Sequence, residues 1–122
     1  MVESCSSMRV KIKRVYEPPD ERDGKRILVD RLWPRGLSKQ SAKIDLWLKD
    51  IAPSTQLRTW FGHDPGKWVD FQKRYRAELR EDYEALAILK SEVAQGPVTL
   101  LYGAKDEEHN QAVVLQNILS SK

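Results

Sequence analysis

Two short, uninterrupted apolar segments most constrain the fold of this chain: ILV at Ile27–Val29 and VTLLY at Val98–Tyr102. A strand with one solvated face alternates apolar and polar residues, whereas a strand buried on both faces does not. The long stretch between the two segments has helical patterns, and a helical crossover joins parallel neighbours. The sequence therefore predicts a small single α/β domain with a short, mostly parallel sheet of about three or four strands flanked by helices.

Local patterns give the remaining strands and the last helix. Apolar and basic residues alternate over Met8–Tyr16, which predicts a strand with one buried face. A second strand spans Arg26–Trp33, and Pro34 and Gly36 end it. The third strand is VTLLY, and the sequence AVVLQNIL at Ala112–Leu119 predicts a helix after it.

Cap residues divide the crossover into helices. Ser38 and Ser41 are both candidate N-caps of a short helix that runs through Leu48. Ser54 precedes a second short helix, which Gly62 ends. Apolar residues then recur at helical spacing, which predicts one buried face made of Trp68, Phe71, Tyr75, Leu79, Tyr83 and Leu86.

Composition places the chain among soluble globular proteins. Of its 122 residues, 40% are hydrophobic and 32% are charged, which excludes a disordered chain. The single cysteine, Cys5, cannot form an internal disulfide, and no Cys or His spacing indicates zinc, so a reducing cytoplasm is the expected compartment. No apolar run is long enough to span a membrane. Residues 1–8 are expected to form a mobile tail, with Met8 as a second candidate start, and residues 9–122 to form the domain.

The net charge is +3, and the excess of Lys and Arg lies in the first third of the chain. A nucleic-acid-binding protein usually carries a denser basic stripe, so nucleic acid is disfavoured as a partner. A modest local excess suits an anionic small molecule. The sequence leaves the oligomeric state open.

The segment DRLWPRG crowds charged residues into the turn that ends the second strand. The guanidinium groups of Arg31 and Arg35 are planar forks that match carboxylate or phosphate. One interpretation is that Asp30 and Arg31 form ion pairs that hold the turn, and the other is that at least one arginine faces a ligand. Trp33 either stacks on a planar ligand or covers the core, and the core is favoured because tryptophan is mostly buried in proteins.

A second polar cluster, GAKDEEHN, follows the third strand. Parallel strands end at the same sheet edge, where open α/β sheets bind ligands, so the two clusters are expected to face each other across a shared cleft. Lys105 is the candidate anion contact. His109 and Asn110 are expected in the first turn of the following helix, each as a cap, a solvent-facing group or a catalytic partner.

Two residues of the crossover complete the candidate site. His63, in the loop FGHDPGKW, is either a solvated side chain or a general base that needs no metal. Arg58 either adds a further guanidinium to the site or is solvated. The candidate catalytic residues are therefore His63 and His109, and the candidate ligand-binding residues are Arg31, Trp33, Arg35, Arg58, Lys105 and Asn110.

No motif indicates a cofactor, a metal site or a particular reaction, since GxGxxG, Walker, HExxH and GxSxG patterns are absent. Three classes of function stay open. The favoured one is a site for a phosphate- or nucleotide-like anion at the carboxyl edge of the sheet, with or without catalysis. The alternatives are a protein-interaction module without a ligand and a nucleic-acid-associated module.

Four segments together resemble the YeaO-like family of bacterial proteins, which contain a domain of unknown function (DUF488): DRLWPRGLSK, APSTQLRTWFGHDPGKW, FQKRYRAEL and TLLYGAKDEEHNQAVVL. The resemblance runs from about Met8 to Leu119. It implies a compact, cytoplasmic, single-domain α/β protein whose signature residues lie in the segments described above. It brings no established activity with it.

A broader group related to this family has the pattern LLCAEKD followed by HCHR, and its cysteines suggest enzymatic activity in that group. In this chain Tyr102 stands at the position of the first cysteine, and HNQA replaces HCHR. Lys105, Asp106 and His109 match the pattern, whereas both thiols and the arginine are absent. Any chemistry in this chain therefore has to use groups other than a thiol.

Overall fold

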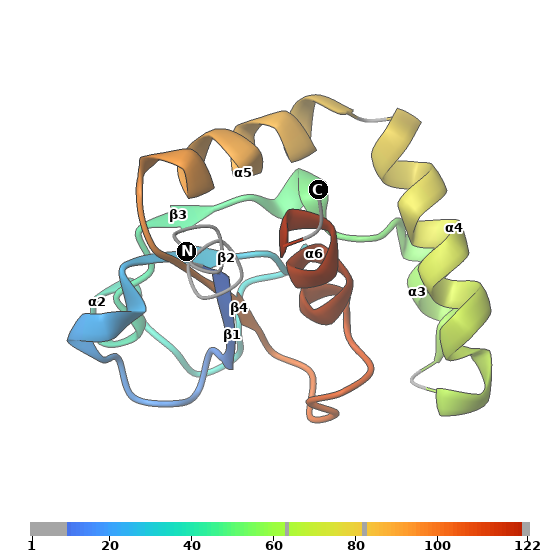
Figure 1. Ribbon diagram of the computed structural model, residues 1–122. Coiled ribbons are helices and arrows are strands. Elements are labelled where there is room, and N and C mark those ends of the chain that lie inside the picture. Colours follow the sequence, from blue (N-terminus) through green and yellow to red (C-terminus); the bar gives the residue numbers. More distant parts are fainter. Residues whose placement is uncertain (1–9, 63, 82, 121–122) are drawn as a thin grey trace.

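The computed structural model describes residues 10–62, 64–81 and 83–120 (Figure 1). The expected tail at residues 1–8 and the candidate base His63 lie outside the described residues. The elements in chain order are β1 (Val10–Arg14), η2 (Glu21–Asp23), β2 (Lys25–Leu28), α2 (Lys39–Ala42), β3 (Leu46–Trp47), η3 (Lys49–Ile51), α3 (Thr55–Phe61), η4 (Pro65–Lys67), α4 (Trp68–Glu81), α5 (Tyr83–Gln95), β4 (Val98–Tyr102) and α6 (Gln111–Ser120), where η marks a 3₁₀ helix.

The four strands form one parallel sheet in the order β1-β4-β2-β3. The two continuous apolar segments lie in or directly after its central strands, β2 and β4, with Ile27 paired to Leu100. The predicted α/β domain with a small parallel sheet is therefore confirmed. The parallel arrangement brings the carboxyl ends of β2 and β4 side by side, which places the turns after them next to each other.

The central strands β2 and β4 are buried on both faces, which explains the uninterrupted apolar segments. In β4, alternate side chains point to opposite faces: Leu100 packs into the main core under the helices, and Leu101 packs into a smaller core with Leu28 and α2. The main core takes its helical side chains from the crossover and from the last helix, including Leu57, Phe61, Phe71, Tyr75, Leu79, Leu86, Leu89 and Leu115.

The two caps of α3 are present in the structure. The hydroxyl of Ser54 accepts a hydrogen bond from the backbone N–H of Leu57 at 3.1 Å, and Gly62 ends α3 in the left-handed conformation at φ 54°. Both features were predicted. Figure 1 shows α3 and α4 side by side at one end of the molecule, with α5 turning back across the sheet. No helix in the described part of the chain is long and apolar enough to cross a membrane.

The predicted apolar stripe is shorter in the structure than in the sequence. Phe71, Tyr75 and Leu79 are buried in α4, but the side chain of Tyr83 is 55% exposed. The stripe is broken because α4 ends at Glu81 and α5 runs in a new direction, so helical spacing no longer keeps Tyr83 on the buried face.

The predicted helix running from Ser38 or Ser41 through Leu48 is wrong. The helix α2 is a single turn that Ser38 caps, and Lys43 ends it in the left-handed conformation at φ 50°. The residues after it form β3, an edge strand whose backbone bonds to β2. The pairing surface that β2 offers outweighs the local helical preference, because tertiary hydrogen bonds override weak propensity.

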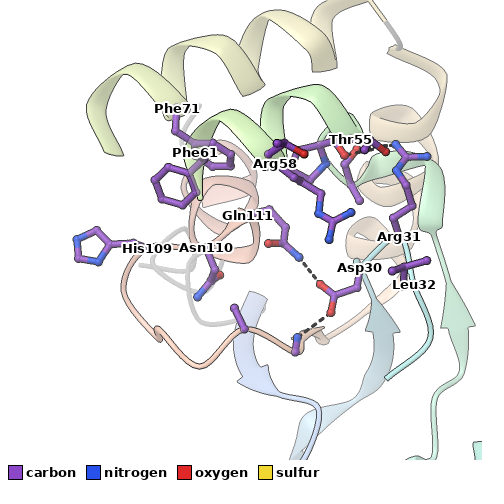
Figure 2. A pocket seen from close by; sticks show the side chains of 15 residues that line it. Asp30, Arg31, Leu32, Thr55, Arg58, Phe61, Phe71, His109, Asn110 and Gln111 are labelled. Atoms are coloured by element: carbon purple, nitrogen blue, oxygen red, sulfur yellow. Dashed lines mark hydrogen bonds between the residues drawn. The ribbon is translucent and has the colours of Figure 1, made fainter. Parts of the chain in front are cut away.

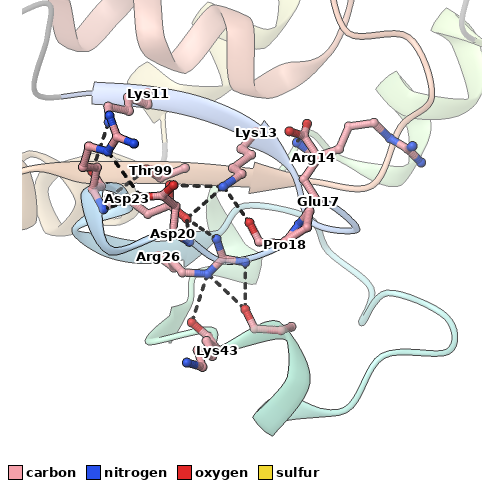
Figure 3. A network of polar contacts seen from close by, with 12 residues as sticks. Lys11, Lys13, Arg14, Glu17, Pro18, Asp20, Asp23, Arg26, Lys43 and Thr99 are labelled. Atoms are coloured by element: carbon pink, nitrogen blue, oxygen red, sulfur yellow. Dashed lines mark hydrogen bonds and ion pairs between the residues drawn. The ribbon is translucent and has the colours of Figure 1, made fainter.

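A buried polar network, the Asp23 network, joins the start of β2 to β1 and α2 (Figure 3). Asp23 and Arg26 are only 4% and 3% exposed and form an ion pair. Lys13 of β1 adds a second cation, with its Nζ 3.1 Å from the Asp23 carboxylate. The Arg26 guanidinium also donates to the carbonyl oxygens of Ala42 and Lys43, so one arginine connects η2, β2 and the end of α2.

Candidate functional site

A cleft of about 600 Å³ opens beyond the carboxyl ends of β2 and β4 (Figure 2). Its volume lies in the range of small-molecule sites, and open α/β sheets bind ligands at this edge. The turn after β2, the start and inner face of α3, and the loop between β4 and α6 form its walls. The lining residues are Asp30, Arg31, Leu32, Ala52, Pro53, Thr55, Arg58, Thr59, Phe61, Phe71, Gly103, Ala104, His109, Asn110 and Gln111.

Asp30 lies in the cleft and is fixed from three sides. Its carboxylate accepts a hydrogen bond from the backbone N–H of Gly103 at 2.8 Å and another from the side-chain amide of Gln111. Its backbone carbonyl accepts from the indole N–H of Trp47 at 2.7 Å. A Cβ at Gly103 would lie 3.0 Å from Asp30 Oδ2, a tight contact that would require the carboxylate to shift slightly. Asp30 is therefore held by β3, the turn after β4, and α6.

Burial raises the pKa of Asp30 above its ordinary value, and the N–H of Gly103, the Gln111 amide and the nearby Arg58 offset this only in part. A desolvated carboxylate costs free energy when it is ionised. Such groups concentrate at functional sites, where they are kept in spite of that cost. The raised pKa of Asp30 therefore agrees with a functional role for this end of the cleft.

Asp30→Asn is expected to leave the free energy of unfolding at pH 7 unchanged or higher. The asparagine carbonyl can still accept from Gly103, and the Gln111 amide can rotate to accept from the new N–H₂ group. Because the folded-state pKa of Asp30 is raised, the ionised group destabilises the fold above that pKa, and stability is regained as the pH falls through it. The advantage of the variant should therefore shrink toward about pH 4, the ordinary range of an aspartate.

Urea unfolding of both proteins over this pH range measures the difference. A loss at pH 7 of about 3 kcal/mol, the scale of a broken buried ion pair, would contradict the expectation.

The two arginines that line the cleft have different surroundings. The guanidinium of Arg31 donates to the backbone carbonyls of Ala52 and Pro53, at 3.2 and 3.5 Å, and thereby connects the turn after β2 to the segment before α3. Its Nε atom is buried and has no hydrogen-bond partner among the described residues. The exposed side chain of Arg58 instead points into the cleft toward Asp30 and Gln111 (Figure 2). In the described part of the chain, its guanidinium makes no hydrogen bond or ion pair.

The sequence suggested that His109 and Asn110 lie in the first turn of the last helix. In the structure both residues lie just before α6, which begins at Gln111. The Nδ1 atom of His109 is 2.9 Å from the Asp106 carboxylate, and the ring meets the Trp68 ring edge-on at 5.2 Å between centroids. Asn110 caps α6, since its amide oxygen accepts from the backbone N–H of Val113 and its nitrogen donates to the Asp106 carbonyl. Both residues line the cleft, but the Asn110 amide is largely occupied by capping.

Three candidate residues do not line this cleft. Arg35 and Lys105 are exposed on the turns that flank it. Trp33 points to the other side of the sheet edge, where it packs against the smaller core, donates its indole N–H to the Leu37 carbonyl and meets Trp47 edge-on. Of the two interpretations of Trp33, the structure gives it the core position. The predicted ion pairing of Asp30 is likewise replaced by its bonds to Gly103 and Gln111.

Several cleft residues were not among the sequence candidates. In the sequence, Asp30 was considered only as a residue that holds the turn, and Gln111 appeared only within a segment that resembles the family. Phe61 and Phe71 form the apolar wall, with their rings stacked at 4.4 Å between centroids, and in the sequence they are ordinary core positions. The signal that could have found Gln111 is its place at the start of the helix after β4, directly opposite the turn that follows β2.

The chain has clear relatives in bacteria. The family model for the inactive DUF488-N3 subclade (DUF488-N3i) matches residues 9–122. The chain is 43% identical over 114 residues to the uncharacterized protein YeaO of Escherichia coli K12, which covers 93% of this chain and 99% of the relative. It is 40% identical over 114 residues to the uncharacterized protein Rv3073c of Mycobacterium tuberculosis H37Rv, which covers 93% and 96%. No solved structure is significantly similar to it.

These matches agree with the four resembling segments, which are distributed over the same residues. They span both turns that form the cleft, together with α3 and α6. Because the family model and both relatives extend over nearly the whole chain, the protein belongs to the YeaO-like DUF488 family, within the subclade described as inactive DUF488-N3.

Proposed function

We propose that this protein binds a small anionic molecule in the cleft at the carboxyl edge of the sheet and does not convert it. The observation that carries the proposal is Arg58. Its guanidinium points into a concave, partly apolar space, and the described residues leave it without a hydrogen-bond partner. A planar guanidinium in such a place suits a carboxylate or a phosphate, which it can bind through two parallel hydrogen bonds.

The rest of the cleft supports the same class of ligand. Arg31 adds a second positive charge to the wall opposite the phenylalanines (Figure 2). Phe61 and Phe71 cover one side with apolar surface, which lowers the local dielectric and strengthens charge interactions inside the cleft. The cleft therefore suits an anion that also carries an apolar or flat part.

The family description and the missing thiols support binding without conversion. The subclade is described as inactive, and the thiol positions of the broader group are filled here by Tyr102 and by non-cysteine residues. Of the two candidate histidines, His63 lies outside the described residues. Asp106 and Trp68 hold His109 on the far side of Phe61 from Arg58 (Figure 2). His109 would then supply a polar contact at the rim and not a proton-transfer group for a molecule held by Arg58.

Arg58→Gln is expected to weaken binding of the anion by about 1.5–3 kcal/mol, the scale of a hydrogen bond to a charged group. The measurement begins with a thermal-shift panel of phosphate, sulfate, nucleoside monophosphates, amino acids and simple carboxylates on the unmodified protein. A ligand at about 100 times its dissociation constant adds about 2.7 kcal/mol of stability, which is a rise of several degrees for a domain of this size. Titration calorimetry then gives the affinities of both proteins for the probe that shifts most.

Arg35→Gln is the matched control, because it removes the same charge from an exposed arginine outside the cleft. It should bind the probe as the unmodified protein does. Equal weakening by both substitutions would show a general charge effect and contradict the site. The absence of a shift with every anion at low salt would contradict the proposed function itself.

A further inference from the structure

Beside the proposed anion contact, the cleft contains two acceptor groups whose capacity the fold does not use. Each oxygen of an ionised carboxylate can accept about two hydrogen bonds. The Asp30 carboxylate receives one from Gly103 and one from Gln111, the two donors that the described residues supply to it. The Gln111 nitrogen is directed at Asp30 and at the Val29 carbonyl, so its amide oxygen points away from Asp30 (Figure 2) and has no donor in the described part of the chain.

The surrounding elements hold the Asp30 side chain in one defined position. Three elements hold the residue, and a Cβ at Gly103 would require its carboxylate to shift slightly, because it would lie 3.0 Å from Oδ2. The folding of the chain does not require a negative charge here, since a neutral amide would satisfy Gly103 equally well. A carboxylate fixed in this way and directed at a cleft is preorganised for a ligand that carries donors.

The charges that border the cleft also disfavour anions that carry no hydrogen-bond donor. Figure 2 shows the Arg58 guanidinium directed toward the same space that Asp30 and Gln111 border. An anion that carries no hydrogen-bond donor would gain from Arg58 and would be repelled by Asp30. A molecule with a nitrogen donor next to its anionic group would satisfy both sides, and this difference is how a site rejects near-analogues.

On this basis, and resting on the proposed function, we propose that the ligand of the cleft is an amino-bearing organic anion. Its carboxylate or phosphoryl group lies against Arg58, and its amine or ammonium donates to the Asp30 carboxylate. The apolar remainder of the molecule lies along Phe61 and Phe71. Amino acids, aminophosphonates and anions with an amino-substituted ring share this chemistry.

The test compares probes that differ only in the amino group. The pairs are phenylalanine with 3-phenylpropionate, glutamate with glutarate, and 2-aminoethylphosphonate with ethylphosphonate, each titrated by calorimetry at pH 7. On the unmodified protein, the amino-bearing member of the pair that binds is expected to be at least about tenfold tighter, which corresponds to one hydrogen bond to a charged group. This comparison needs no variant, so a folding defect cannot obscure it.

Variants then test which residues are responsible for the preference for the amino-bearing member of the pair. Asp30→Asn should reduce the difference within the pair to less than about threefold, whereas Arg58→Gln should weaken both members. Glu107→Gln, an exposed acid outside the cleft, is the matched control for the lost charge and should keep the preference.

The possible outcomes separate the two proposals. Equal binding of both members, with a loss in Arg58→Gln, would overturn the amino-bearing ligand and leave the anion site intact. A preference that Asp30→Asn does not reduce would also overturn it. If no probe of any pair binds and no other anion does, the proposed function is overturned together with this inference.

Discussion

Asp23→Ala is expected to lower the free energy of unfolding by about 3–5 kcal/mol, the cost of removing one partner from a buried ion pair. The substitution would leave the guanidinium of Arg26, which is 3% exposed, without its carboxylate. It would also remove the partner of Lys13 and the acceptor for the backbone N–H of Asp20. Urea denaturation of the two proteins measures the difference.

Arg22→Ala is the control for this prediction. Arg22 forms an exposed ion pair with Asp20 at 3.6 Å, and an exposed pair contributes about 0–1 kcal/mol. A loss for Asp23→Ala no larger than that for Arg22→Ala would contradict a structural role for the Asp23 network.

The pH dependence of stability provides an independent check on Asp23. Burial by itself raises the pKa of this carboxyl, but the backbone N–H of Asp20 and the cations Lys13 and Arg26 outweigh burial and lower the pKa overall. A lowered folded-state pKa gives stability that is present above the unfolded-state value, about 3.9, and is lost as the pH falls through the folded-state pKa. Asp23 and Asp30 should therefore have opposite effects: acid removes the contribution of the first and relieves the cost of the second.

Gly24→Ala is the second large effect that we expect, at about 3 kcal/mol or more. Gly24 has φ 67° and ψ −137°, a conformation that residues with a Cβ rarely adopt, and such strain costs about 1–3 kcal/mol. A Cβ at Gly24 would in addition lie 2.4 Å from the carbonyl oxygen of Pro97, a backbone atom that cannot turn away. That same oxygen accepts the N–H of Lys25, so moving it would disturb the first pairing of β2 with β4.

Gly36→Ala distinguishes the cost of backbone strain from the cost of the steric clash with Pro97. Gly36 also has a positive φ, 81°, but apart from its chain neighbours no atom of the described residues lies within 4 Å of the position that its Cβ would take. It should therefore lose only the strain energy, about 1–2 kcal/mol. Equal losses in the two variants would mean that the close approach of Gly24 to Pro97 contributes nothing.

The sequence by itself was sufficient to predict those elements whose structure depends on neighbouring residues alone. ILV and VTLLY predicted strands buried on both faces, and β2 and β4 are the central strands of the sheet. The Ser54 cap and the Gly62 end of α3 were predicted because capping involves only neighbouring residues. The two polar turns were expected together because parallel strands end at one edge, and both turns line the same cleft.

The sequence was not sufficient where a partner far along the chain decides the outcome. Leu46 and Trp47 have no strong strand signal, yet they form β3 because β2 offers a free edge. Tyr83 continues the spacing of an apolar stripe, yet it is exposed because the chain changes direction between α4 and α5. Periodicity reports the face of one helix and carries no information about where the next helix turns.

For the candidate site, the sequence determined which segments meet, and the tertiary structure decided which side chains of those segments face the cleft. Arg31, Arg35, Trp33 and Lys105 have the right chemistry and lie in the right turns, but only the first of them lines the cleft. Asp30 and Gln111 meet across more than eighty positions of the chain. Their contact depends on the sheet register, which is not a property of the local sequence.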